Sequence, residues 1–264
     1  MTGSIEFLNK KIHYKSEGTG RALVLIHGFI ESLDIWDDFS AELKKDFQVV
    51  SIDLPGHGFS EQRGYVHTMP QMADCVNAVL EHLGISSCVM AGHSMGGYVA
   101  LAYAKKYTGK TKGLVIFHSH AAGDTEEGKK NRERAIRVVE SEHGHFIWSF
   151  IPDLFAPENR VRFSGQIKKL RDKASLMSKD AIIAALEGMK QREDMQEFLS
   201  GYDQPVMFIV GKKDSRIQMK QMIEQIALPR HSEALILGDA GHMGYIEERD
   251  VTLAALAGFV SRID

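Results

Sequence analysis

The sequence predicts an α/β protein: a mostly parallel, twisted β-sheet flanked by helices, with a helical insertion. Two observations support this fold class. Runs of consecutive apolar residues, such as ALVLIH at 22–27, have the pattern of strands that are buried on both faces of a sheet. Segments with helical periodicity, such as 69–83, separate these runs, and an alternation of strands with helices is typical of parallel sheets.

The first half of the chain divides into elements in order. Residues 4–16 alternate apolar and polar side chains, which predicts two short strands before the buried run at 22–27. Turn-forming residues, Pro55-Gly56-His57-Gly58, end the next buried strand. The elements expected after 27 are a helix near 33–45, a strand at 47–54, a helix over 69–83, a strand at 87–94 and a helix over 95–107.

The second half adds three strands and a last helix: 112–119, 205–214, 232–242 and 248–262. Between 120 and 200 there is no run with buried-strand character, and several charged segments have helical periodicity. We therefore expect one core domain, formed by 1–119 and 201–264, into which residues 120–200 are inserted as a helical subdomain.

Composition limits the partners that the chain can have. Lys and Arg total 32 against 35 Asp and Glu, a formal net charge of −3, so no basic surplus points to nucleic acid or to an anionic membrane. The expected partner is a small-molecule substrate. The sequence leaves open whether the chain is a monomer or a homodimer.

Cysteine usage and the first residues predict a cytoplasmic protein. Cys75 falls in a predicted helix and Cys88 in a predicted strand, which argues against a disulfide framework. The N-terminal segment lacks the continuous apolar core of a signal peptide, and no apolar run is long enough to span a membrane.

The strongest local signal is Gly92-His93-Ser94-Met95-Gly96, a G-x-S-x-G motif at the point where a predicted strand gives way to a helix. A sharp turn there forces the serine into a strained backbone conformation, and the flanking glycines remove Cβ atoms that would collide with the strand and the helix. Such a turn holds Ser94 out toward a substrate and predicts a nucleophile. The alternative is a glycine-rich turn without chemistry.

A serine hydroxyl is a weak nucleophile at neutral pH, and it needs a base that is itself oriented by an acid. Asp214 ends the predicted strand 205–214, and His242 ends the segment 232–242, which gives the chain order Ser, Asp, His. Because parallel strands end at the same edge of a sheet, the three residues can meet there. We predict His242 as the base and Asp214 as the acid.

Rivals for both roles exist. His93 directly precedes Ser94, and its side chain should point away from the nucleophile. For the acid, Asp203 lies before its strand and Asp239 lies close to the histidine, and both remain alternatives to Asp214. Among the 12 histidines, those without a comparable placement are His57, His67, His82, His143 and His231.

Two backbone amides are expected to stabilise the negative charge of a tetrahedral intermediate. Met95 follows the nucleophile at a helix N-terminus, and Phe29 follows His27-Gly28 at the end of a strand. The His27-Gly28 pair could otherwise be an ordinary turn after a strand.

In combination, these motifs resemble the α/β-hydrolase fold, and within it the lid-bearing esterase, lactonase and haloperoxidase-like group. The resemblance covers nearly the whole chain and implies that residues 120–200 form a lid over Ser94. It rests on His27-Gly28-Phe29, the segment 53–60, the segment 92–97, Gly211-Lys212-Lys213-Asp214 and Gly241-His242. The resemblance implies a largely apolar substrate pocket, suited to an acyl or alkyl group, with these candidate lining residues: Phe29, Met95, His118, His120, Phe146, Trp148, Phe155 and Met243. Alternatively, the aromatic residues of the lid pack it onto the core.

Departures from related subfamilies narrow the activity. Haloalkane dehalogenases and epoxide hydrolases carry an aspartate nucleophile where this chain has Ser94. The menaquinone-pathway synthase of this fold usually has an arginine where Tyr98 stands, and meta-cleavage carbon–carbon hydrolases commonly have an asparagine where His93 stands.

We therefore predict a serine hydrolase of the carboxylesterase type, which cleaves a small carboxylic ester or a related acyl substrate through an acyl-enzyme intermediate. An activated serine with oxyanion donors needs no metal and no organic cofactor, and no cysteine–histidine cluster in the sequence resembles a metal site. Two alternatives remain: a carbon–carbon bond hydrolase or lyase that uses the same triad, and a small-molecule receptor that turns over slowly.

Overall fold

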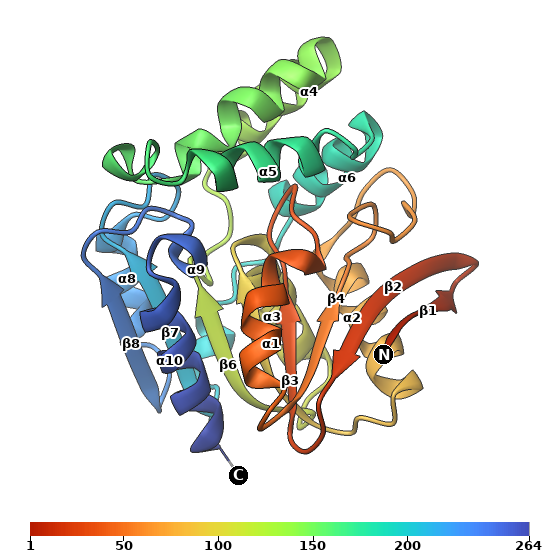
Figure 1. Ribbon diagram of the computed structural model, residues 1–264, viewed down its shortest axis with the longest axis vertical. Helices are drawn as coiled ribbons and strands as arrows, with labels where there is room; N and C mark the ends of the chain where they lie inside the picture. Colours follow the sequence, from red (N-terminus) through yellow and green to blue (C-terminus); the bar gives the residue numbers. More distant parts are fainter. Residues whose placement is uncertain (264) are drawn as a thin grey trace.

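An eight-stranded sheet runs through the computed structural model, which describes residues 1–263 (Figure 1). The strands lie in the order β1-β2-β4-β3-β5-β6-β7-β8, with antiparallel pairing from β1 through β4 and parallel pairing from there on. The strands are β1 (Thr2–Phe7), β2 (Lys10–Glu17), β3 (Ala22–Ile26), β4 (Gln48–Ile52), β5 (Cys88–His93), β6 (Thr111–Phe117), β7 (Val206–Gly211) and β8 (Ser232–Leu237). The predicted fold class, a mostly parallel sheet flanked by helices, is confirmed.

Helices cover both faces of the sheet. In the view of Figure 1, α1 and α10 lie in front of the strands, and α2 and α3 lie behind them. The helices of the core are α1 (Asp37–Leu43), α2 (Met69–His82), α3 (Met95–Lys106), α8 (Met219–Ile226), α9 (Gly244–Glu247) and α10 (Arg249–Ser261). This double cover explains why every residue of β3, β5 and β7 is buried.

Residues 126–200 form helices and short 3-10 turns, and none of the eight strands falls in this part of the chain. The helices are α4 (Glu126–Phe150), α5 (Ser164–Ala174), α6 (Lys179–Lys190) and α7 (Gln196–Ser200). Figure 1 shows α4, α5 and α6 together beyond one end of the sheet. Within residues 1–263, no helix combines the length and the apolar character that a membrane crossing requires.

Local sequence explains where α2 begins. Thr68 caps α2: its side chain accepts from the N–H of Gln71, and the side chain of Gln71 accepts from the N–H of Thr68. The short helix α8 was not predicted. It has only 8 residues, too few for a helical period to stand out in the sequence.

Candidate active site

Ser94 occupies a sharp turn between β5 and α3. Its φ of 52° and ψ of −116° lie in a region that residues with a side chain rarely adopt. The turn is held because the N–H of Ser94 donates to the C=O of Phe117 at 2.9 Å and its C=O accepts from the N–H of Gly97 at 2.9 Å. A Cβ at Gly92 would collide with the backbone of Gly96. A Cβ at Gly96 would collide with the carbonyl groups of Ile26 and His27. Gly92 is therefore required where β5 packs against α3, and Gly96 where α3 packs against the end of β3.

Asp214 lies in the turn after β7, and four N–H groups surround its carboxylate. Oδ1 accepts from the backbone N–H groups of Arg216 at 2.7 Å and Ile217 at 3.0 Å. Oδ2 accepts from Nδ1 of His242 at 2.8 Å and from Nδ1 of His118 at 3.0 Å. Burial opposes the charged form, but His242 and these hydrogen bonds hold the pKa of Asp214 well below its usual range. The carboxyl group is therefore ionised at neutral pH.

His242 lies in the loop between β8 and α9, against this acid. Because its Nδ1 donates to Asp214, Nε2 is the nitrogen that remains to accept a proton. The loop is fixed by its backbone: the N–H of His242 donates to the C=O of Leu154 at 2.7 Å. His242 and Ser94 line the same cavity, of about 200 Å³. The structure thus brings the predicted nucleophile, base and acid together at one edge of the sheet.

His118 was expected to line the pocket, and this expectation is wrong. Its side chain is fully buried beside Asp214, at a residue whose φ of 46° is left-handed. Burial lowers the pKa of His118 to about 4, so the ring is neutral and Nδ1 carries the proton that it donates to the carboxylate. Its Nε2 faces Gly244, where a Cβ would collide with it. His118 is therefore a second donor to the acid and not a contact for a substrate.

The side chains of His118, Asp214 and His242 could also be considered as metal ligands. One nitrogen or oxygen atom from each lies within 4.8 Å of the others, and no other such group occurs in residues 1–263. Hydrogen bonds already satisfy both oxygens of Asp214. The cluster therefore requires no ion to balance its carboxylate.

Sequence reasoning did not find a buried ion pair in the wall of the site, formed by Glu31 and His93. Oε2 of Glu31 accepts from the N–H of Gly28 at 2.6 Å and from Nδ1 of His93 at 2.9 Å, and Oε1 accepts from the hydroxyl of Tyr245 at 3.0 Å. Nε2 of His93 donates to the C=O of His242 at 2.9 Å. A carboxylate and a carbonyl can only accept, so both nitrogens of His93 carry protons and the ring is a cation. In agreement, Glu31 outweighs the effect of burial and raises the pKa of His93.

The Glu31–His93 pair connects the loop after β3 to the loop that carries His242. The carbonyl that His93 holds belongs to His242, and the carboxylate of Glu31 holds the amide of Gly28. No motif marks Glu31 in the sequence. Its position three residues after Gly28, in a loop at a strand end, was the signal that could have suggested it.

The N–H groups of Met95 and Phe29, the two predicted oxyanion donors, donate to no acceptor within residues 1–263. Met95 is the first residue of α3, where the helix dipole adds positive partial charge. Phe29 lies in the loop after β3 and lines the cavity with Ser94. The side chain of Met95 is fully buried, so this residue can contribute only its amide.

Most of the side chains expected in the pocket lie elsewhere. Phe29 and His120 line the cavity. Trp148 faces outward, with 59% of its surface exposed and the guanidinium of Arg171 over its ring. Phe155 packs against Phe163, with ring centres 6.2 Å apart. The others of this set that are buried in the core or under the inserted helices are Met95, Phe146 and Met243.

Phe146 illustrates why the expectation failed. It stacks on Phe150 at a centroid distance of 5.2 Å and meets the edge of Phe29 at 6.4 Å. Its ring is used to pack α4 onto the loop after β3, which is the alternative that the sequence left open for these aromatic residues.

The cavity is also more polar than expected. Three charged side chains line it: Asp124 and Arg132 from the inserted segment, and Arg216 from the turn that carries Asp214. In the sequence, the charges of the inserted segment resemble those of solvated helices, so nothing distinguishes Asp124 and Arg132 there, and no motif marks Arg216. The other lining residues that sequence reasoning missed are Glu31, His93, Tyr98, Phe150, Leu154, Met189 and Ile217.

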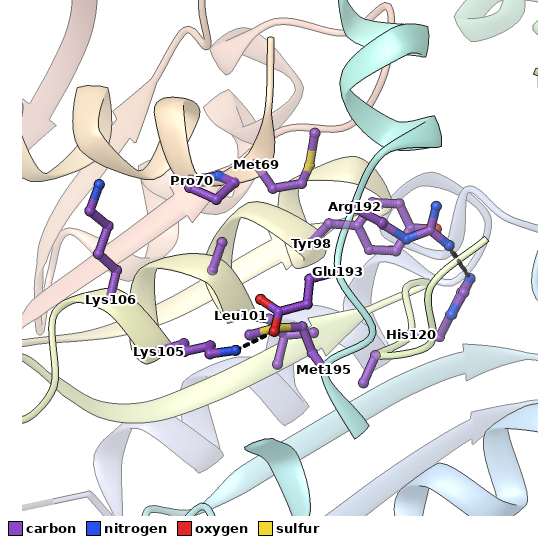
Figure 2. Close-up of a pocket in the computed structure, with 12 residues that line it drawn as sticks. Met69, Pro70, Tyr98, Leu101, Lys105, Lys106, His120, Arg192, Glu193 and Met195 are labelled. Carbon is purple, nitrogen blue, oxygen red and sulfur yellow. Dashed lines mark hydrogen bonds and ion pairs between the residues drawn. The ribbon is translucent and has the colours of Figure 1, made fainter. Parts of the chain in front are cut away.

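A second cavity, of about 330 Å³, lies next to the first and shares Tyr98 and His120 with it. Figure 2 shows Arg192 beside the ring of Tyr98, and its Cζ lies 4.1 Å from the ring centre. The hydroxyl of Tyr98 and Nε2 of His120 are 3.2 Å apart, so these two side chains separate the cavities. The second cavity is mostly apolar, with Met69, Leu101, Ala102 and Met195 in its wall.

Comparison with known proteins agrees with this architecture. A family model described as alpha/beta hydrolase fold matches residues 21–131. Among solved structures, a thermophilic esterase from Thermogutta terrifontis is similar with a TM-score of 0.93 and 29% identity, over 99% of this chain and 98% of that chain. The chain therefore has the α/β-hydrolase fold.

Curated relatives include hydrolases of similar length. The pimeloyl-[acyl-carrier protein] methyl ester esterase of Xanthomonas oryzae pv. oryzae is 24% identical, over 96% of this chain and 100% of the relative. The dihydrolipoyllysine-residue acetyltransferase component of the acetoin cleaving system from Pseudomonas putida is 26% identical over 92% of this chain. The match spans only 64% of that longer protein.

Proposed function

We propose that this chain is a serine hydrolase that cleaves a small carboxylic ester or a related acyl substrate through an acyl-enzyme intermediate. One observation carries the proposal. Nδ1 of His242 donates to the ionised carboxylate of Asp214 at 2.8 Å, and the same histidine lines one small cavity with Ser94 in its strained turn.

The reaction follows from this arrangement. Oγ of Ser94 attacks the acyl carbon while Nε2 of His242 takes its proton, and Asp214 stabilises the imidazolium that forms. The imidazolium then gives the proton to the leaving alcohol. Water, activated by the same histidine, attacks the acyl-enzyme, and release of the acid restores the hydroxyl of Ser94.

The amides of Met95 and Phe29 would hold the oxyanion of both tetrahedral intermediates. Each aligned donor lowers such a barrier by about 3–4 kcal/mol. Their lack of any other acceptor in the part of the chain that the structure describes supports this role.

Residues 120–200 act in this proposal as a lid subdomain over a core formed by 1–119 and 201–264. The cavity supports that division, because Arg132 and Phe150 of α4 and Met189 of α6 line it together with Ser94 of the core. Pockets for drug-sized ligands usually measure about 300–1,000 Å³. A cavity of about 200 Å³ therefore favours a small substrate.

The relatives favour ester chemistry, since the Thermogutta protein and the Xanthomonas protein are both named as esterases. The direct test is hydrolysis of 4-nitrophenyl butyrate by the wild type and by Ser94→Ala. We expect the alanine variant to lose about 10⁴-fold or more in kcat. The wild type should accumulate a butyryl group on Ser94 that mass spectrometry detects after an acid quench.

Ser119 supplies a matched control. It lies after the neighbouring strand β6, its hydroxyl is buried without a partner within residues 1–263, and Ser119→Ala removes the same atom. That variant should retain its activity. Cleavage of a vinylogous diketone without ester hydrolysis would favour the carbon–carbon hydrolase, and ligand-dependent stabilisation with negligible turnover would favour the receptor.

A further inference from the structure

The wall of the Ser94 cavity carries an excess of positive charge, although the chain as a whole has a formal net charge of −3. The charged residues that line it, besides the histidines, are Glu31, Asp124, Arg132 and Arg216. Glu31 is neutralised by His93. Asp124 is then the one remaining carboxylate of this lining, and it faces more than one arginine.

Asp124 binds two guanidinium groups. Its Oδ1 accepts from Nη1 of Arg192 at 2.6 Å, and its Oδ2 accepts from Nε of Arg132 at 2.9 Å. Arg192 is fully engaged: it also donates to two backbone carbonyls, and it stacks on Tyr98 (Figure 2). Arg132 donates only through Nε within residues 1–263, so its terminal nitrogens remain available to a ligand.

Arg216 has no carboxylate partner within residues 1–263. Its backbone N–H donates to Oδ1 of Asp214, which ties it to the turn of the acid. Its guanidinium stacks over the ring of Phe150, with Cζ 4.5 Å from the centroid, and this contact directs it to the cavity that both residues line. Part of the Arg216 side chain is exposed to solvent. Burial of the remainder lowers its pKa, Asp153 and Asp214 oppose that effect, and Arg132 lowers the pKa further. Two cations thus face one cavity and repel each other.

We infer that the cavity takes a substrate that itself carries a carboxylate, which Arg216 and Arg132 bind while Ser94 attacks the acyl carbon. The planar fork of a guanidinium matches the two oxygens of a carboxylate, and a bound anion would remove the repulsion between the two arginines. The small volume of the cavity places the carboxylate within a few bonds of the group that is cleaved. This inference rests on the proposed function and specifies its substrate class.

The test compares matched esters that differ only in charge. The first pair is the 4-nitrophenyl monoester of adipic acid and the ester whose acyl group ends in a neutral carboxamide instead. The second pair places the anion on the alcohol side, as 4-carboxyphenyl butyrate and 4-carbamoylphenyl butyrate. For the wild type, we expect kcat/KM for the anionic member of one pair to exceed that of its neutral partner by about 10- to 100-fold. This ratio corresponds to the contribution of one hydrogen bond to a charged group.

Variants assign the preference to the arginines. In Arg216→Gln and in Arg132→Gln the ratio of anionic to neutral kcat/KM should fall about tenfold or more, whereas Arg216→Lys should restore part of it because a lysine keeps the charge but not the fork. Arg134→Gln is the matched control, because Arg134 is exposed on the same helix as Arg132 and contacts only Asn131 by a side-chain hydrogen bond. Its ratio should equal that of the wild type.

A binding measurement separates the two proposals. Adipate should raise the melting temperature of Ser94→Ala, and less so when Arg216→Gln is added. If wild type hydrolyses both members of both pairs equally and Arg216→Gln leaves the ratios unchanged, the carboxylate site is wrong and the hydrolase stands. If no ester is hydrolysed while adipate stabilises the protein through Arg216, the carboxylate site stands and the hydrolase is wrong.

Discussion

Replacing Asp214 with asparagine converts one carboxylate oxygen into an amino group and leaves the size of the side chain unchanged. In the wild type Oδ1 accepts from the amides of Arg216 and Ile217, and Oδ2 accepts from His242 and His118. The single oxygen of asparagine can serve only one of these two sets. Whichever way the amide points, two donors face its NH₂ group and lose their acceptor: either the two buried histidine rings or the amides of Arg216 and Ile217, of which the first is near solvent.

The expected magnitude follows from that count. A buried donor without an acceptor costs about 1–3 kcal/mol, so the free energy of unfolding falls by up to about 2–6 kcal/mol if both histidines lose their acceptor, and by less if the two amides do, because water can reach the amide of Arg216. If the amino group faces the histidines, His242 can regain a hydrogen bond only by moving its proton from Nδ1 to Nε2. The nitrogen that should accept the serine proton is then blocked, as in serine proteases, where the same substitution lowers kcat by about 10⁴-fold. We expect a loss of about 10³- to 10⁴-fold.

The assay is kcat/KM for 4-nitrophenyl butyrate together with urea unfolding. Two aspartates that the sequence left as rivals provide matched controls. Asp203 is 75% exposed and pairs with Arg230, and Asp239 is 77% exposed and pairs with Lys213. Asp203→Asn and Asp239→Asn should stay within about twofold of the wild type, as expected for surface pairs. An Asp214→Asn variant that keeps more than about a tenth of the activity, or a larger loss in Asp239→Asn, would refute the assignment of the acid.

Three other changes probe the surroundings of the site. Gly92→Ala places a Cβ against the neighbouring backbone and should lower the free energy of unfolding by at least about 1–3 kcal/mol. In the control Gly144→Ala the added Cβ meets no atom within 4 Å, so the free energy of unfolding should not fall. A similar loss in both variants would contradict the packing argument. Glu31→Gln should lower the melting temperature most between pH 4.5 and pH 6.5, the ordinary pKa values of Glu31 and His93 in the unfolded chain. The ion pair stops stabilising the fold as the pH falls through the lowered pKa of Glu31 or rises through the raised pKa of His93. A decrease that is the same at every pH would count against the ion pair. His118→Phe removes one donor to the acid and should lower kcat about tenfold with little change in KM; a change in KM alone would assign His118 to substrate binding.

The core of the fold could be predicted from the sequence because burial on both faces leaves a continuous apolar run. ALVLI at 22–26 and the strand Val206–Gly211 are such runs, and both strands have a neighbour on each side in the sheet. The turn at Ser94 was predictable for a similar reason, since only glycine fits at positions 92 and 96. A short amphipathic helix such as α8 leaves a weaker pattern.

The lining of the cavity could not be predicted, because it depends on how the inserted helices pack over the sheet edge. Trp148 and Phe150 lie two residues apart on α4 and therefore on opposite sides of the helix, and only the packing of α4 decides that Trp148 is exposed and Phe150 lines the cavity. Likewise, nothing in the sequence distinguishes Arg132 from Arg134. Only the path of the helix decides which of them reaches Asp124.

Reaction with a fluorophosphonate tests most directly whether His242 activates Ser94. The reagent forms a stable adduct with a serine hydroxyl whose proton a neighbouring base removes, and intact mass followed by peptide mapping locates it. The account predicts one adduct, on Ser94, that is absent from Ser94→Ala and forms far more slowly in His242→Ala. Equal labelling of the wild type and Ser94→Ala would contradict it.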